Sequence, residues 1–574
     1  MATPDGSPPH VIVPLTSPTH CPLQSSIFCP TRPTSPTSPR SHTSPVSPTT
    51  PTSFTRPSSP SSPSSPSSPS SPSSPSSPSS PSIDSTPDYP GYTGLYLQYF
   101  TVGIIACALP ASLYGFLLSY LGVASYVYAT AAQVIALPWS FKILYGMVND
   151  CFPYRGYHRK PYMALGWVIC TAALGVLAYI PMPEPGESGA AGKYCLLMSI
   201  VAAGYIMSDV AADGLTVENA KKEDVATRGT LQSNVYLVRT LGSIAAALLV
   251  GFGMNGKEYS GDSEFSLSFA QLCGVLAVPA ALMVPVSWYW VYEPRKPRTV
   301  SVKTYARDCY ELLSHKAMFY VAVYSLAHGA IGDINTTAAG NVMKVWAGVH
   351  NMQAALFGVV AAAIFATGLY LVKTYLLHVN WRHIIIGTTI LLTVIDLVFT
   401  YCTIYNVLRN QYFFLGESVV VMVPAAARFL MTTFVVVEMA QDGKEGLTYG
   451  LLTTLHNLGG PVAQAISNSL FATFTPSLSN AQNYKRDTQS FRNTVATSYG
   501  VGYAMGLIAL LLLPLFPSQK AQARQRMQDW GSDTRYAKAI IAITAVTWLY
   551  SVTMNMLAIF PQTQCLQFVG GDGC

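Results

Sequence analysis

Thirteen apolar runs of about 20 residues follow Tyr92, and they constrain the fold more than any other feature of the sequence. A helix of that length crosses the hydrocarbon core of a bilayer. Charged residues make up only 10% of the chain, less than half the usual share in a soluble domain. We therefore predict an all-α polytopic membrane protein embedded in a lipid bilayer. The expected spans are residues 97–121, 127–148, 163–180, 194–217, 230–253, 267–292, 317–339, 353–375, 383–402, 413–440, 447–474, 497–516 and 537–560.

Lys and Arg alternate among the predicted loops in the way that the positive-inside rule describes. Loops of one parity hold 20 of these residues, and loops of the other parity hold seven. This asymmetry predicts a cytoplasmic N-terminus in a plasma or intracellular membrane, with the C-terminus on the opposite side. The polar tail after the last run contains Cys565 and Cys574, which could pair if that side is oxidising.

The longest basic loop divides the first twelve spans into two sets of six. Two six-helix bundles joined by a cytoplasmic loop form an architecture in which a solute site lies at the bundle interface. The expected parts are a disordered Ser/Pro-rich cytoplasmic tail (1–92), an N-terminal bundle (93–292), a cytoplasmic linker (293–316), a C-terminal bundle (317–516), and a basic loop with one extra C-terminal transmembrane helix and a short tail (517–574).

Composition argues against several other classes of protein. The basic residues are scattered singly, so no face suited to nucleic acid is expected. The cysteines have no Cys-x-x-Cys spacing and the ten His residues do not group, which argues against a metal site and against an enzyme. No nucleotide-binding loop of the full Gly-x-x-x-x-Gly-Lys-Ser/Thr type is present. We expect a monomeric protein without cofactors.

One segment between the second and third spans, residues 138–162, is the most informative. Its candidate gating residues are Gly146, Asp150, Arg155, Arg159 and Lys160. Asp150 could act as a latch that bonds to a neighbouring helix end in one state and is released in the other. The alternative is an ordinary capping Asp beside charges that only fix the topology.

This segment resembles the folate-biopterin transporters, a branch of the major facilitator superfamily. The resemblance rests on Pro138, Trp139, Lys142, Gly146, Asp150, Pro153 and the run from Gly156 to Tyr162, and it continues at Asp209 to Asp213, Glu218, Arg239, Gly242, Gly443 to Gly446 and Asn457. Ile143 and Asn149 depart from the family pattern, in which Pro and Ser usually stand, so the latch could be tuned differently. The resemblance implies alternating access and a folate- or pterin-like solute.

Ionisable residues inside membrane spans are costly and are functional candidates by default. Asp209 and Asp213 are four residues apart and share one helix face. Repulsion between two close carboxylates favours protonation of one of them. The proton taken up there would act as the coupling ion. The alternative is a structural pair that is neutralised by Lys142 or Arg239.

Arg239 and Arg428 both fall near mid-membrane, in the fifth and tenth spans. An acidic face in the first half would then oppose a basic residue in the second half. Folate would fit such a site, because its pterin edge pairs with a carboxylate and its glutamate carboxylates are bound by Arg. A structural salt bridge between the bundles is the competing interpretation.

Four further intramembrane residues are possible members of the pathway: His328, Asp333, Asp396 and His456. A packing role is the alternative for each of them. Two alternatives to a folate carrier also stay open. One is a carrier for another nitrogenous metabolite, such as S-adenosylmethionine or a nucleoside-like compound, and the other is a transporter-like receptor that binds without transport.

Overall fold

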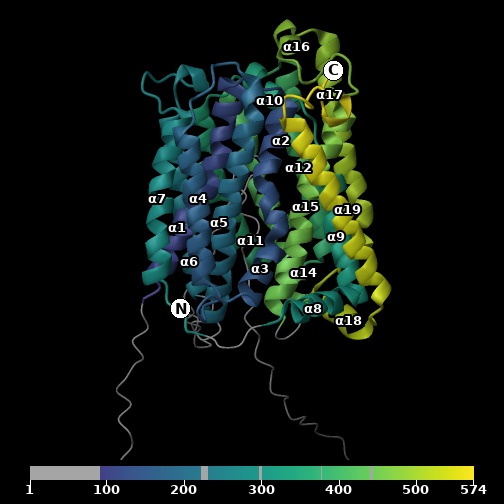
Figure 1. Ribbon diagram of the computed structural model, residues 1–574. Coiled ribbons are helices and arrows are strands. Elements are labelled where there is room, and N and C mark those ends of the chain that lie inside the picture. Colours follow the sequence, from purple (N-terminus) through teal and green to yellow (C-terminus); the bar gives the residue numbers. More distant parts are fainter. Residues whose placement is uncertain (1–90, 221–229, 296–299, 377, 440–443) are drawn as a thin grey trace, which may run out of the picture. The chain divides into compact units, whose positions relative to one another are not determined.

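The computed structural model describes residues 91–220, 230–295, 300–376, 378–439 and 444–574. These residues are almost entirely helical, and the long helices run side by side (Figure 1). The Ser/Pro-rich tail up to residue 90, and Gly443 of the family resemblance, lie outside the described residues.

Six membrane-length segments make up the first half. They are α1 (Thr93–Leu113) continued by η1 (Tyr114–Tyr120); α2 (Ser125–Ala136), η2 (Leu137–Phe141) and α3 (Lys142–Cys151) in one segment; α4 (Lys160–Tyr179); α5 (Ala191–Ala220); α6 (Thr230–Gly253); and α7 (Phe269–Tyr289). Pro138 in η2 lacks a backbone N–H donor, and the second segment changes there from α-helical to 3-10 geometry. This change of geometry lies directly before Lys142.

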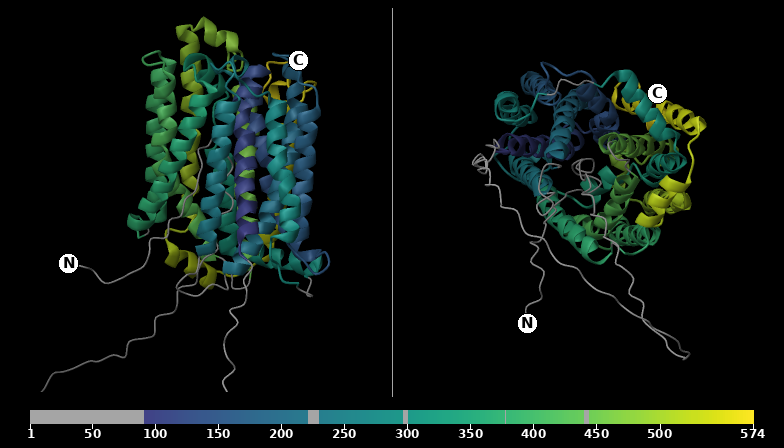
Figure 2. Two further views of the ribbon diagram at one scale, coloured as in Figure 1. Left: turned by 90° about the vertical axis from the view of Figure 1, so that its left-hand side faces the viewer. Right: turned by 90° about the horizontal axis from the view of Figure 1, so that it is seen from below.

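Six further segments make up the second half. They are α9 (Lys316–Gly332) followed by α10 (Ala339–Asn341) and η5 (Val342–Trp346); α11 (Asn351–Tyr375); α12 (Trp381–Ile404); α13 (Gln411–Val420) with α14 (Met422–Met439); α15 (Glu445–Phe471); and α17 (Gln489–Ala509) with η6 (Leu510–Leu515). The short α16 (Ala481–Arg486) lies between α15 and α17. Seen from below, the helices of both halves surround a common centre (Figure 2).

Eleven helices in the described ranges are long and apolar enough to cross a membrane. Two of the predicted spans are not among them. α9 has only 17 residues, because the seventh span is interrupted after Gly332 and resumes at Ala339. α15 has 27 residues, but its many Thr, Asn and Gly residues lower its hydropathy. The polar character of α15 fits its position between the two halves, where it contacts α9, α2 and α3.

Two segments predicted as loops contain helices instead. α8 (Val302–Ser314) lies within the predicted linker and α18 (Lys520–Asp529) within the predicted basic loop. In α8 the Ser301 side chain accepts a hydrogen bond from the Thr304 N–H at 3.1 Å, which caps the helix, and Leu312 and Leu313 are buried. Both helices lie across the lower end of the bundles in Figure 1.

Close contact between α1 and α6 depends on two glycines. A Cβ atom at Gly103 would lie 2.0 Å from the backbone oxygen of Arg239, and one at Gly242 would lie 2.1 Å from that of Phe100. Neither position tolerates a side chain without separation of the helices. The two glycines thereby hold Arg239 against the interior of the first half.

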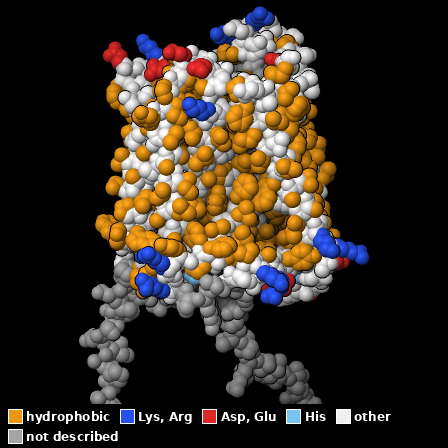
Figure 3. Space-filling view, in the orientation of Figure 1, with side chains coloured by type: hydrophobic (Ala, Val, Ile, Leu, Met, Phe, Trp, Pro, Cys, Tyr) orange, Lys and Arg blue, Asp and Glu red, His pale blue; other side chains and the backbone are white. Residues whose placement is uncertain are grey.

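The surface has the pattern of a membrane protein. Hydrophobic side chains cover the middle of the face in Figure 3, and Lys, Arg, Asp and Glu gather toward its two ends. Such a band matches contact with lipid tails between two polar interfaces.

The extra C-terminal helix predicted from the last apolar run is α19 (Thr534–Ile559). It packs against helices of both halves. The tail beyond it is closed by a disulfide between Cys565 and Cys574, in agreement with the pairing that the sequence suggested.

Candidate functional site

Four charged side chains of the first half form two ion pairs. Lys142 Nζ lies 3.0 Å from Asp213 Oδ2, and Arg239 Nη1 lies 3.0 Å from Asp209 Oδ1. The pairs join α3 to α5 and α6 to α5. Each aspartate therefore has its own cation, in the arrangement that the structural alternative anticipated for Asp209 and Asp213.

The two pairs differ in how far they are buried. The side chains of Asp209 and Arg239 are 0% and 2% exposed, whereas that of Asp213 is 16% exposed. Oδ2 of Asp209 has no hydrogen-bond partner among the described residues. A buried pair is costly to break, so Asp213 is the carboxylate better placed to exchange partners.

Aromatic side chains surround these charges. Tyr99 donates a hydrogen bond to Asp213 Oδ1 at 2.8 Å. The Trp139 ring centroid lies 5.4 Å from Lys142 Nζ and 5.9 Å from the Arg239 guanidinium carbon. These rings give the cations a partly apolar neighbourhood in which cation–π attraction adds to the ion pairs.

The second half reaches this group through α15. The ring centroid of Tyr449 lies 5.6 Å from Lys142 Nζ. Nearby, the backbone N–H of Ile143 donates to Thr454 Oγ1 at 3.1 Å, and Asn457 Nδ2 donates to the Trp139 carbonyl at 3.4 Å. The first-half charges therefore lie directly beside the interface between the halves.

Arg428 belongs to a separate group in the second half. It acts electrostatically on His328, Asp333 and His456, which lie on or beside α9 and α15. Close contact of these helices is possible because a Cβ atom at Gly459 would lie 2.8 Å from Gly329 Cα. The Nε2 atom of His328 has no hydrogen-bond partner in the described part of the chain.

The sequence predicts an acidic face opposite Arg428, and in the structure each of these charges has neighbours within its own half. Asp209 and Asp213 bind cations of their own half, and Arg428 lies with Asp333 and two histidines. The physical reason is that a buried carboxylate takes the nearest available cation. The arrangement contains two charge groups, one in each half, with α15 in contact with both.

Asp396 lies apart from both groups. It accepts a hydrogen bond from Thr400 Oγ1 at 2.8 Å, and its electrostatic neighbour is Glu417 of α13. The structure thus brings His328, Asp333 and His456 together with Arg428, and it separates Asp396 from them.

The predicted gating residues meet at the lower end of the first half. Arg159 Nη2 lies 2.7 Å from Asp150 Oδ1 and 3.6 Å from Glu218 Oε1, so one guanidinium joins the ends of α3 and α5. Glu293 accepts hydrogen bonds from the backbone N–H groups of residues 158, 159 and 160 at 2.8 to 3.0 Å. A carboxylate at the N-terminus of α4 is favoured by the helix dipole and fixes the turn that carries Arg159.

The other gating candidates lie around this ion pair. Lys160 Nζ donates to the Trp288 carbonyl at 3.0 Å. A Cβ atom at Gly146 would lie 3.4 Å from the Tyr305 hydroxyl of α8. Arg155 has a positive φ of 52° and its guanidinium carbon lies 5.3 Å from the ring centroid of Tyr154.

We expect Arg159→Ala to lower the maximal transport rate about two- to fivefold, because partly exposed ion pairs contribute modestly. The variant removes the guanidinium that joins Asp150 to Glu218 and changes none of the charged residues of the candidate solute site. Initial uptake rates at saturating solute would measure the effect. Arg307→Ala is the matched control, since it removes an exposed Arg from an ion pair on α8 that is not part of the gating candidates, and an equal loss in both variants would contradict a specific latch.

Several residues that contact the site charges or the gating turn are not identified by the sequence analysis. Tyr99 lies in an apolar run and Tyr449 in a weakly polar one, so neither carried a signal of its own. Glu293 was counted only as part of a basic loop. A lone acid among basic residues, next to a helix end, was the signal that could have identified it.

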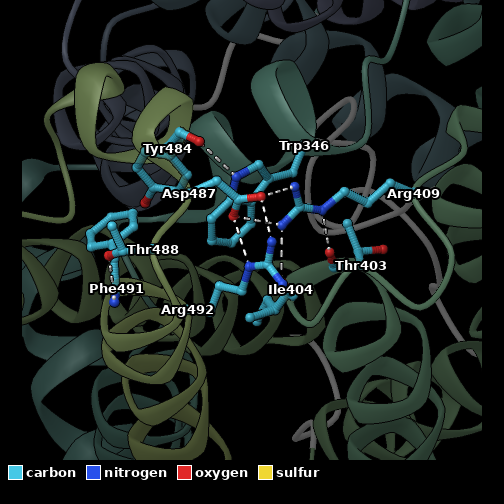
Figure 4. Close-up of polar contacts among 9 residues, drawn as sticks. All are labelled: Trp346, Thr403, Ile404, Arg409, Tyr484, Asp487, Thr488, Phe491 and Arg492. Carbon is cyan, nitrogen blue, oxygen red and sulfur yellow. Dashed lines mark hydrogen bonds and ion pairs between the residues drawn. The ribbon is translucent and has the colours of Figure 1, made fainter.

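An ion-pair network outside the candidate site, drawn in Figure 4, lies beside α16 and α17, at the end of the molecule opposite α8 (Figure 1). Asp487 lies 2.7 Å from Arg409 and 2.6 Å from Arg492, and the Arg409 guanidinium lies 4.6 Å from the Trp346 ring centroid. These contacts join the loops before α13 and α17. Hydrogen bonds from the two Arg side chains outweigh burial and lower the pKa of Asp487 to about 2.

The lowered pKa of Asp487 predicts an acid-sensitive contribution to stability. The unfolded carboxyl titrates near its ordinary value of about 4, so the contribution is complete above that pH and is lost as pH falls toward about 2. We expect Asp487→Asn to lower the free energy of unfolding by about 1 kcal/mol near neutral pH. Thermal unfolding at several pH values would measure the difference in the free energy of unfolding between parent and variant. If this difference is the same above and below this pH range, the prediction is contradicted.

No group of three His, Cys, Asp or Glu side chains suited to a metal ion occurs within the residues that the structure describes. The arrangement can bind a solute that carries both hydrogen-bond donors and anionic groups, because carboxylates and guanidinium or ammonium groups lie within one site.

Comparison with known proteins adds independent information. The sequence pattern of the BT1 family matches residues 103–529. A folate-biopterin transporter of Synechocystis sp. is 24% identical over 379 residues, which cover 65% of this chain and 73% of the relative. Folate transporter 1 of Plasmodium falciparum is 21% identical over 347 residues, which cover 58% of this chain and 64% of the relative.

Solved structures share the fold. The nucleoside transporter NupG aligns with a TM-score of 0.53 at 14% identity, over 73% of this chain and 98% of its own. A D-xylose-proton symporter aligns with a TM-score of 0.54 at 13% identity, over 74% of this chain and 97% of its own. At such low identity the likeness concerns the arrangement of helices alone.

Proposed function

The chain belongs to the BT1 family, and on this premise we propose that it carries a folate- or pterin-type solute by alternating access. It is a multi-pass membrane transporter with the major facilitator fold, and not an enzyme. The proposed solute class is supported by two relatives, a folate-biopterin transporter of Synechocystis sp. and folate transporter 1 of Plasmodium falciparum.

One observation carries the proposal: each half contains its own group of charged side chains among its helices, and α15 contacts both. The first-half group centres on Asp213 and Arg239, and the second-half group on Arg428. A solute that bridges the two groups would couple its binding to the relative position of the halves, as alternating access requires.

The chemistry of folate matches both signs of charge. The N–H groups of a pterin edge donate to a carboxylate, and glutamate carboxylates accept paired hydrogen bonds from a guanidinium. We assign the carboxylate role to Asp209 or Asp213, and the cation role to Arg239, Arg428 or Lys142. Trp139 and Tyr99 would flank the flat pterin ring.

Proton coupling follows from the exchange of partners at Lys142. An anionic solute group that binds Lys142 displaces Asp213 and leaves a carboxylate without its cation. Protonation of Asp213 removes that unfavourable charge, so solute and proton bind together. We therefore propose proton symport, with Asp213 as the proton acceptor.

The proposed orientation places α8, α18 and the gating residues in the cytoplasm. The excess of Lys and Arg in loops on that side supports it. The disulfide between Cys565 and Cys574 supports it as well, because disulfides persist on the oxidising side of a membrane.

Counterflow of labelled folate into proteoliposomes tests the proposal. We expect accumulation that is competed by folate and biopterin more strongly than by S-adenosylmethionine, and that increases at acidic external pH. Binding without accumulation would identify a receptor instead. Preferential competition by S-adenosylmethionine would identify a carrier of another solute class.

A further inference from the structure

α19 lies outside the part of the chain that the family shares. The family match ends at residue 529, and α19 begins at Thr534. The helix contacts α2 and α5 of the first half and also α9 and α15 of the second half. Figure 1 shows it in yellow along the outer side of α15 and α9. It therefore lies across the seam between α2 and α15, where the halves must separate during transport.

Specific contacts hold α19 within the membrane. Asn555 is 1% exposed, and its Nδ2 donates to the Pro461 carbonyl of α15 at 2.8 Å. On the other side, the Trp548 ring stacks on Phe141 of η2, with centroids 5.0 Å apart. A buried amide that bonds to a neighbouring backbone fixes the helix in one register.

The tail after α19 also binds both halves. Tyr126 of α2 donates from its hydroxyl to the Gln564 carbonyl at 2.5 Å. Ser469 of α15 donates to the Phe568 carbonyl. The tail thus forms a hydrogen bond to each half, at the end of the molecule opposite the gating residues.

Direct contacts also join the halves at this end. Lys344 Nζ donates to the Leu118 carbonyl at 2.6 Å, and Asn468 Nδ2 donates to Thr130 Oγ1 at 2.7 Å. Leu118 packs with Ala347 in a buried apolar cluster that contains residues of both halves. In the structure, this end is closed.

We infer that α19 and the tail 561–574 form a strap that holds the two halves together at this end. Opening there requires the tail to release its bond to α2 or to α15. The strap thereby stabilises the state in which the end beside the C-terminal tail is closed. Without the strap, the carrier would occupy this state for a smaller fraction of the time. The inference rests on alternating access as proposed above, and it is independent of which solute is carried.

A buried thiol reports opening of this end. Ala347→Cys places a small side chain in the apolar cluster between the halves, where the parent residue is 5% exposed. The rate of maleimide labelling in the purified full-length protein measures how often the cluster opens. Labelling of the protein without this substitution is subtracted to remove the contribution of native cysteines.

Two glycines of the tail provide a matched pair of variants. Gly570 has a φ of +116°, and a Cβ atom there would lie 2.5 Å from the Tyr126 ring. Gly573 has a similar φ of +105°, but a Cβ atom there meets nothing within 4 Å. Both changes to Ala carry a similar backbone cost, and only Gly570→Ala displaces the tail from α2.

We expect Gly570→Ala to raise the labelling rate of the reporter about two- to tenfold above that of Gly573→Ala, as loss of a buried hydrogen bond would. Tyr126→Phe is a milder second test, should Gly570→Ala prevent folding. Its control is Tyr194→Phe, which removes a hydroxyl that donates to the Pro181 carbonyl at 3.1 Å within the first half.

Equal rates of maleimide labelling in both members of each pair would contradict the strap proposal. Labelling needs no solute, so a failed strap and a failed folate assignment give different results. If the protein transports another solute and Gly570→Ala still labels faster, the strap proposal is supported and only the folate proposal is contradicted.

Discussion

Arg239→Ala is expected to abolish solute uptake, with a loss of about 100-fold or more. The guanidinium pairs with Asp209 at 3.0 Å, and both side chains are almost completely buried. Removal of one member of a buried pair leaves the other charge uncompensated and costs about 3–5 kcal/mol. Uptake of labelled folate by cells or proteoliposomes, normalised to protein in the membrane, measures the loss.

A double variant separates solute binding from stability. Arg239→Gln combined with Asp209→Asn replaces the ion pair by two amides and leaves no buried charge at either position. We expect its melting temperature to return toward that of the parent while uptake stays lost, because an amide cannot hold a carboxylate as a guanidinium does. Recovery of uptake in the double variant would reduce Arg239 to a structural role.

The fold could be predicted from the sequence to a large extent, because hydropathy and loop charge are strong signals in membrane proteins. Lipid forces every span to be helical and apolar, and misplacing one span would scramble the Lys and Arg asymmetry. The extra helix, α19, was predicted on the same grounds. α8 and α18 were missed because short amphipathic helices at an interface have no long apolar run.

The candidate site could be predicted only as a set of residues. Asp209 and Arg239 stand out because charge is rare in membrane spans, but the sequence does not say which carboxylate meets which cation. That choice depends on how α3, α5 and α6 pack, for example on the contact that Gly103 and Gly242 allow. For the same reason, the sequence does not predict that the neighbours of Arg428 lie on or beside α9 and α15.

Asp213→Asn is expected to remove the dependence of uptake on external pH, because the proposed proton acceptor is lost. Asp213 pairs with Lys142 and accepts a hydrogen bond from Tyr99, and its side chain is more exposed than that of Asp209. An amide keeps the shape and part of the hydrogen bonding but cannot take up a proton. In the parent, a proton gradient should drive uptake. In Asp213→Asn, uptake in the presence of the gradient should fall to the level of exchange measured without a gradient.

The control for this variant is Asp396→Asn, which removes a carboxylate from a membrane helix that lies apart from both charge groups. Its pH profile should follow that of the parent. Solute counterflow needs no net proton movement, so we expect Asp213→Asn to retain it while gradient-driven accumulation is lost. If Asp213→Asn instead keeps the parent pH profile, the proton binds elsewhere, and the Asp333 and His456 group of the second half becomes the next candidate.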